Sequence, residues 1–149
     1  MAQTHNNGPL ASGDKQPGTP GLPAGGNVGL AVLSQTFLID FDATLVQTRQ
    51  IALPVNSQIV NIFCDVLTAY NSATSATLTV GTAAAGTQYA SGVNARTAGR
   101  AIPTFTAAQR AAMDDTGTNE GVFATVTSVG QPTAGQVRVT VQYVQTTGI

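Results

Sequence analysis

Apolar and polar residues alternate between Leu53 and Gly81, and this stretch predicts the strands around which the chain is arranged. Side chains two positions apart lie on the same face of a strand. We expect one face of the first strand to be core, and its apolar residues are Val60, Ile62, Cys64, Val66 and Tyr70. Small polar residues from Asn71 to Ser75 then predict a turn, and Thr77 to Val80 predict a return strand paired with the first.

The opposite face of this first strand is half apolar, because Ile59, Phe63 and Leu67 alternate with Asn61 and Asp65. An outer row of this kind is often covered by something. We therefore predict that Ile59, Phe63 and Leu67 pack between subunits. The alternative is that the chain covers this row itself, with residues 28–33 or with the loop of residues 82–102.

The remaining strands are predicted at Val28 to Phe41, Leu45 to Leu53, Gln88 to Ala90, Gly121 to Thr127 and Val137 to Tyr143, and the alternation is cleanest in the last two. The turn of residues 131–135 makes the last two strands a predicted hairpin. Between Thr82 and Ile102 the chain is rich in Ala, Gly and Thr, which indicates a surface loop anchored by Tyr89 and Val93.

A short helix is predicted from Ala107 to Met113, because Thr106 and Gln109 have the spacing of a capping box. Many short strands with a single helix indicate an all-β fold, an antiparallel β-sandwich, and a jelly roll is one form that it can take. We expect this sandwich to occupy residues 28–149.

Residues 1–27 differ from the rest because they are rich in Gly, Pro, Asn and Gln and have only Leu10 and Leu22 as sizeable apolar side chains. Such a segment cannot form a core of its own. We predict an extended arm that binds a partner outside the domain, through Pro17, Pro20, Leu22, Pro23 and Asn27.

Charge is scarce, since charged residues make up 9% of the chain and Lys15 is the one lysine. A typical soluble protein has roughly 25%. The surface must therefore be mostly neutral and polar, which suits contact with other proteins.

Nucleic-acid binding is not expected, because the arginines are scattered rather than clustered. Neither a signal peptide nor a transmembrane segment is expected, since no apolar run has the necessary length.

No motif indicates catalysis, so we expect no enzyme, no metal and no cofactor. His5 lies in the arm without positioned partners, and a nucleophile in the folded part would have no histidine as its base. Two carboxylate pairs, Asp40 with Asp42 and Asp114 with Asp115, lack the ligand spacing of a calcium loop and are interpreted as solvated turn residues. Cys64 is expected to be a buried apolar residue.

Three segments resemble small virion proteins of tailed bacteriophages: residues 53–60, residues 66–81 and residues 132–144. The first reads LPVNSQIV, the second contains VLTAYNS and TLTVG, and the third begins PTAGQVRV. The resemblance is to β-sandwich cement or decoration proteins of the capsid, and the arm lies outside it. It implies a protein made in the host cytoplasm that binds the major capsid protein on the capsid surface, often as a homotrimer, and ties neighbouring capsomers together.

Two other functions remain open. A head-fibre, head–tail joining or tail accessory protein would use the same sandwich elsewhere in the virion. A receptor- or carbohydrate-binding module would use loops for recognition. That module usually has exposed aromatic residues, and this chain has no tryptophan and Tyr89 as its loop tyrosine.

Overall fold

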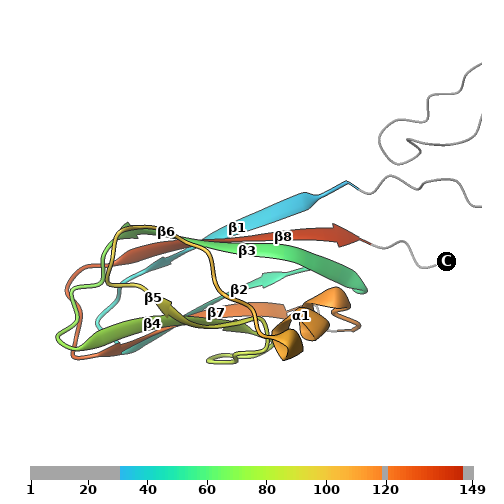
Figure 1. The fold of residues 1–149 in the computed structure, drawn as a ribbon. Helices are drawn as coiled ribbons and strands as arrows, with labels where there is room; N and C mark the ends of the chain where they lie inside the picture. Colours follow the sequence, from blue (N-terminus) through green and yellow to red (C-terminus); the bar gives the residue numbers. More distant parts are fainter. Residues whose placement is uncertain (1–30, 119–120, 146–149) are drawn as a thin grey trace, which may run out of the picture.

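The structure is a computed structural model that describes residues 31–118 and 121–145. These residues form two antiparallel sheets of four strands each, one above the other in Figure 1. The first sheet contains β1 (Leu33–Asp40), β8 (Gln136–Gln145), β3 (Ser57–Thr68) and β6 (Gly99–Ala101), in that order. The second contains β2 (Val46–Ala52), β7 (Gly121–Val129), β4 (Ser75–Gly81) and β5 (Ala90–Asn94).

The strand order is that of an eight-stranded jelly roll, in which the chain passes from one sheet to the other after almost every strand. Among the described strands, β4 and β5 are the one pair of consecutive strands that are hydrogen-bonded to each other. The all-β sandwich predicted from the sequence is therefore confirmed.

The arm of residues 1–27 lies outside the described residues, and with it lie Pro17, Pro20, Leu22, Pro23 and Asn27. The prediction that this arm binds a partner stays a prediction.

The core lies between the two sheets and is built from small branched side chains. Val137, Val139 and Val141 of β8 are fully buried and face Val122 and Val126 of β7 across the sandwich. Burying one such side chain contributes about 1.5–3 kcal/mol. The apolar parity predicted for the strands at residues 121–127 and 137–143 is therefore confirmed.

The two predicted hairpins are wrong, although their strands exist. β3 and β4 belong to different sheets, and so do β7 and β8. Instead, β8 lies between β1 and β3, and β7 lies between β2 and β4. The physical reason is that alternation reports which face of a strand is buried, whereas the choice of partner strand depends on how the connections cross between the sheets.

β3 contains two irregularities that change its parity. Its register against β8 shifts between Ile59 and Asn61 and again between Val66 and Thr68, so Val60 and Leu67 are extra residues of β-bulges. Val60 is 49% exposed and Leu67 is 45% exposed, whereas Ile59 is 4% exposed and belongs to the core. The placement of Ile59 on the outer face, and of Val60 on the inner face, is therefore wrong because of the first bulge.

The inner face of β2 carries a polar contact that alternation does not reveal. Gln47 is 2% exposed, and its Oε1 accepts a hydrogen bond of 2.7 Å from the hydroxyl of Tyr70. Its Nε2 donates to the carbonyls of Asp42 and Thr44, both at 3.2 Å. All the hydrogen-bonding groups of this buried amide are thus satisfied, as burial requires.

The helix α1 (Ala107–Asp114) confirms the predicted capping box. The Oγ1 of Thr106 accepts from the Gln109 amide at 3.2 Å, and the Gln109 side chain accepts from the Thr106 amide at 2.9 Å. The helix lies at one end of the sandwich (Figure 1) and packs against β3. Tyr89 and Val93 are buried anchors as predicted. The short strand predicted around residues 88–90 is observed at residues 90–94, and residues 99–101 form a strand where loop was expected.

No helix in the described part of the chain has the length and apolarity that crossing a bilayer requires.

Candidate protein-interaction surface

The outer face of the first sheet carries a row of side chains that crosses all four strands. Leu38 of β1 is opposite Arg138 of β8, which is opposite Asp65 of β3, which is opposite Arg100 of β6. Residues directly opposite each other in an antiparallel sheet have their side chains on the same face. The jelly-roll topology therefore places an apolar residue and three charged residues from distant parts of the sequence side by side.

Asp65 holds both arginines of this row. Its Oδ1 accepts from Nε of Arg100 at 2.7 Å, and its Oδ2 accepts from Nη2 of Arg100 at 3.1 Å. Nη2 and Nε of Arg138 also donate to Oδ2, at 2.9 and 3.3 Å. The hydrogen bonds from Arg100 and Arg138 lower the pKa of Asp65 from 3.8 to about 2. The carboxylate is thus ionised at neutral pH, and it fixes the position of both guanidinium groups.

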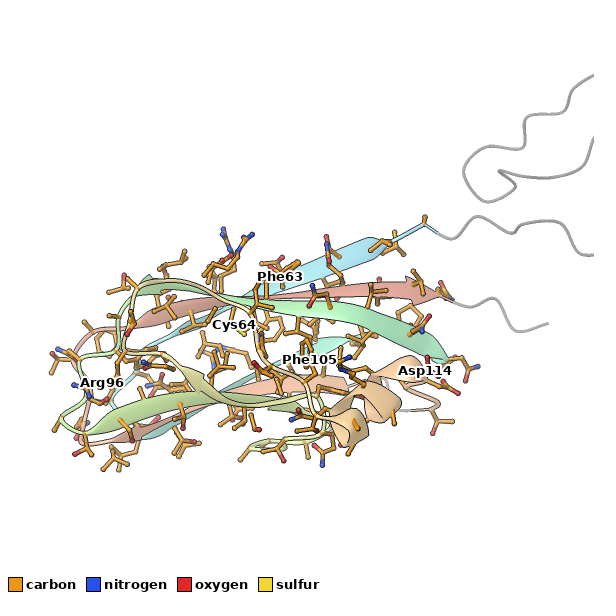
Figure 2. The ribbon with its side chains drawn as sticks, in the orientation of Figure 1. Phe63, Cys64, Arg96, Phe105 and Asp114 are labelled. Carbon is orange, nitrogen blue, oxygen red and sulfur yellow. The ribbon has the colours of Figure 1, made fainter. Side chains whose placement is uncertain are left out.

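Phe63 extends this row along β3. Its ring lies 5.3 Å from the Arg100 guanidinium carbon, within the range of a cation–π contact. Figure 2 shows Phe63 on the outer side of the upper sheet, whereas its neighbour Cys64 lies between the sheets. Burial, with a smaller contribution from the charge of Asp65, raises the pKa of Cys64 to about 12. Cys64 is fully buried, so the prediction that it is a core residue is confirmed.

We call Leu38, Phe63, Asp65, Arg100 and Arg138 the outer patch. Its net charge is positive, because one carboxylate balances one of two guanidinium groups. The Arg100 and Arg138 side chains are 58% and 43% exposed, and each keeps N–H donors that Asp65 does not use. Arginines held beside an aromatic ring are residue types that are enriched at protein interfaces, and Leu38 is exposed next to them.

The outer patch includes only part of the predicted intersubunit row. Phe63 belongs to it, Leu67 flanks it as an exposed bulge residue, and Ile59 is excluded because it is buried. The two arginines were missed. Alternation places Arg138 on an outer face, but only the topology shows that Arg138 and Arg100 meet at Asp65. That Phe63 and Leu67 contact another subunit stays a prediction.

The alternative that the chain covers this row itself is supported in part for the loop of residues 82–102, whereas residues 28–30 lie outside the described residues. Arg100, from the predicted loop of residues 82–102, lies over Phe63. The beginning of that loop instead covers the other sheet, where the amide of Ala85 donates to Oγ1 of Thr125 at 2.9 Å. Thr125 is consequently 1% exposed although it points away from the core. This part of the loop therefore covers the outer face of the second sheet and not the row on β3.

A polar hollow of about 670 Å³ lies at the end of the sandwich where β3 leads to β4. Arg96, labelled in Figure 2, lines it, and its Nη1 donates to the carbonyl of Thr74 at 2.7 Å. The side-chain Nδ2 of Asn94 donates to Oγ1 of Thr97 at 3.3 Å. These groups form hydrogen bonds with their neighbours, and Tyr70, which lines the hollow, is 1% exposed, so the hollow presents no exposed aromatic ring to a sugar.

The carboxylate pairs have structural contacts. Asp42 accepts hydrogen bonds from the amide and the hydroxyl of Thr44, which lower its pKa. Asp40 accepts from Gln136 at 2.5 Å, and Asp114 accepts from Gln58 at 2.8 Å. No group of three or more His, Cys, Asp or Glu within residues 31–118 and 121–145 is placed to hold a metal ion.

The fold and this surface define a small jelly-roll protein with an exposed arginine-containing patch on one sheet. No known family model and no curated protein sequence matches the chain. Two solved structures share its fold. A chain of the "Cyanophage Pam1 capsid asymmetric unit" is 21% identical with a TM-score of 0.53, and the match covers 89% of this chain and 95% of that one. A chain of the "Capsid of Ralstonia phage GP4" is 17% identical with a TM-score of 0.52, covering 86% and 91%.

Proposed function

We propose that this protein is a structural component of a bacteriophage virion that binds the outside of the capsid and cements neighbouring capsomers. The observation that carries this proposal is the shared fold with two phage capsid chains along most of each chain. Since the coverage is high in both directions, those capsid chains are of similar length to this one, as expected for small proteins of one kind.

The surface chemistry supports a role in binding protein rather than nucleic acid. With 9% charged residues, the chain has little charge to keep copies and partners apart. The outer patch combines an aromatic ring, an exposed leucine and two fixed arginines on a sheet face that few of the described residues cover. We propose that the outer patch and Leu67 contact the major capsid protein, whose acidic side chains or backbone carbonyls would accept from Arg100 and Arg138.

Cementing requires that each copy contact more than one capsomer. We propose that residues 1–27 supply the second contact, with Leu22 as the apolar anchor and Pro17, Pro20, Pro23 and Asn27 around it. When two weak contacts are linked in one molecule, the second forms at a high effective concentration. A homotrimer, which the sequence resemblance implies, would multiply these contacts. We propose no catalytic step in this mechanism.

The test is co-sedimentation of the purified protein with capsids of the phage that encodes it, prepared without this protein. We expect saturable binding at a stoichiometry comparable with the major capsid protein. Leu67→Asp should weaken binding about tenfold, as removal of an interface residue worth about 1.4 kcal/mol does. Val129→Asp is the matched control, because Val129 is 53% exposed on the other sheet.

Deletion of residues 1–26 tests the arm separately, and we expect a folded protein that no longer holds expanded capsids together. If neither Leu67→Asp nor the deletion changes binding, the proposed contacts are wrong. If the protein is present in only a few copies per virion, a head-fibre, head–tail joining or tail position replaces the cementing role. If it binds bacterial polysaccharide and not capsids, the recognition-module hypothesis replaces both.

A further inference from the structure

We propose that β1 is a docking strand, and that its partner is the β1 strand of a second copy of this chain. The contact would pair the two strands antiparallel around a two-fold axis and join two sheets into one of eight strands. This inference goes beyond the proposed function and does not depend on it. It rests on a comparison of the backbone N–H and C=O groups that point outward from the edge strands of the two sheets.

The first step is the direction in which the backbone of β1 points. The amide of Phe41 donates to the carbonyl of Gly135 at 2.9 Å, in register with the β1–β8 ladder. Hydrogen-bonded and non-hydrogen-bonded pairs alternate along an antiparallel ladder. The N–H and C=O groups of Ser34, Thr36, Leu38 and Asp40 therefore point away from β8, toward the open edge. No described side chain donates a hydrogen bond to their carbonyls.

The second step is a comparison with β2, the edge strand of the other sheet. The amide of Ser128 donates to the carbonyl of Leu45 at 2.7 Å, so the even-numbered residues of β2 face its open edge. Side chains cap most of the carbonyls there. The Val46 carbonyl accepts from Thr44 at 2.9 Å, the Thr48 carbonyl from Arg49 at 3.1 Å, and the Ala52 carbonyl from Gln35 at 3.2 Å.

The two remaining edges are protected in other ways. β5 has five residues and contains Gly92 with a φ of 69°, and β6 has three residues. Short edge strands, irregular backbone and charged residues are the usual means by which proteins prevent edge-to-edge pairing. β1 uses none of them: it has eight residues, LSQTFLID, without proline, glycine or any charge before Asp40. Among the described edges, β1 alone is long and uncapped.

The third step identifies the occupant as a second copy. A head-to-tail contact between copies would need a second open edge on the same molecule, and the described edges other than β1 are short or capped. An isologous contact needs only one, because the same surface is used twice. Residues 1–27 suit the role poorly, since Pro9, Pro17, Pro20 and Pro23 cannot donate to a ladder.

One register satisfies every open group of β1. If Phe37 lies opposite Phe37 of the second copy, Ser34 pairs with Asp40 and Thr36 pairs with Leu38 across the axis. The pairing then contains about eight backbone hydrogen bonds. The two Asp40 carboxylates lie at opposite ends of the contact, so no like charges meet. Because the axis is perpendicular to the sheet, the outer patches of both copies share one continuous face.

The experiment is light scattering on the purified full chain at micromolar concentrations, without capsids. We expect a mass that is an even multiple of one chain: a dimer, or six chains if the contact joins two trimers. Thr36→Pro removes an edge-facing N–H and should halve the mass. Gln50→Pro is the matched control, because Gln50 occupies the equivalent edge-facing position of β2, and it should leave the mass unchanged.

Leu38→Lys is a second variant in case the proline disturbs folding, since Leu38 is 43% exposed and lysine on an edge strand disfavours edge-to-edge pairing. Register is tested by cysteines. Phe37→Cys should give an oxidised dimer, because opposed residues of a non-hydrogen-bonded pair lie about 4.5 Å apart, within disulfide range. Ser34→Cys should not, because its two copies would be about 20 Å apart.

A monomeric native protein at these concentrations overturns the proposal. So does an oligomer whose mass Thr36→Pro and Leu38→Lys leave unchanged, or one that Ser34→Cys crosslinks as readily as Phe37→Cys. These results concern pairing between copies of the chain, and the co-sedimentation experiment measures capsid binding separately.

Discussion

Replacing Asp65 by Asn should lower the free energy of unfolding at neutral pH, because the variant loses the charged contacts of Asp65 with Arg100 and Arg138. The pKa of Asp65 falls from 3.8 to about 2, chiefly through hydrogen bonds from Arg100 and then from Arg138. A shift of this size corresponds to roughly 2.4 kcal/mol, at about 1.36 kcal/mol per pKa unit. Because the two arginine side chains are 58% and 43% exposed, screening by solvent reduces the contribution to about 1 kcal/mol.

The pH dependence follows from the direction of this shift. The folded-state pKa of Asp65 lies below the unfolded-state value, so the stabilisation is complete above about pH 4 and is lost as pH falls through about 2. Thermal unfolding followed by circular dichroism should show a midpoint about 4 °C lower for Asp65→Asn than for the native protein at pH 7. At pH 2 the difference should be mostly lost.

Asp115→Asn is the control for Asp65→Asn. The Asp115 side chain is exposed and accepts one hydrogen bond, from the amide of Gly117 at 2.7 Å, which an asparagine oxygen can also accept. We expect no measurable change in the unfolding midpoint. Equal midpoints for the native protein and Asp65→Asn at pH 7 would refute the argument, as would a difference that stays constant between pH 7 and pH 2.

Three further predictions concern the interior. Tyr70→Phe leaves Oε1 of Gln47 buried without its donor. Urea unfolding should therefore show a free energy of unfolding that is about 1–3 kcal/mol lower. Unchanged stability would contradict the buried hydrogen bond. Gly135→Ala should reduce stability far more than Gly92→Ala. A Cβ at Gly135 would lie 2.5 Å from the Tyr70 ring, whereas a Cβ at Gly92 meets nothing within 4 Å. Similar losses of stability for both variants would contradict this. Cys64 should react with a thiol reagent only after unfolding, since burial raises its pKa to about 12, and rapid labelling of the native protein would contradict its burial.

The secondary structure was accessible from the sequence wherever one local rule decides it. The capping box of Thr106 and Gln109 depends on residues three positions apart, and the observed helix extends one residue beyond the predicted end. The core face of β8 follows from plain alternation. Local rules do not decide which strands pair. The predicted pairing of β3 with β4 and of β7 with β8 was wrong, because a jelly roll places these consecutive strands in different sheets.

The outer patch was only partly predictable for the same reason. Phe63 could be placed on an outer face from the pattern, but Ile59 could not, because the bulge at Val60 shifts the parity by one residue. Nothing in the sequence relates Arg100 to Arg138. They meet only because β3 lies between β6 and β8, so the charged part of the surface depends on topology.

The outer patch and the edge of β1 meet at Leu38, whose backbone points to the edge and whose side chain belongs to the patch. Pairing of two β1 strands would therefore double the patch on one face, and a capsid would be bound through two patches at once. The second patch would bind at the effective concentration that the first one imposes. Thr36→Pro should consequently weaken binding to capsids although Thr36 lies outside the outer patch, whereas Leu67→Asp should weaken binding and leave the mass in solution unchanged. Leu67→Asp would thus reduce capsid binding without loss of dimerisation, whereas Thr36→Pro would reduce both.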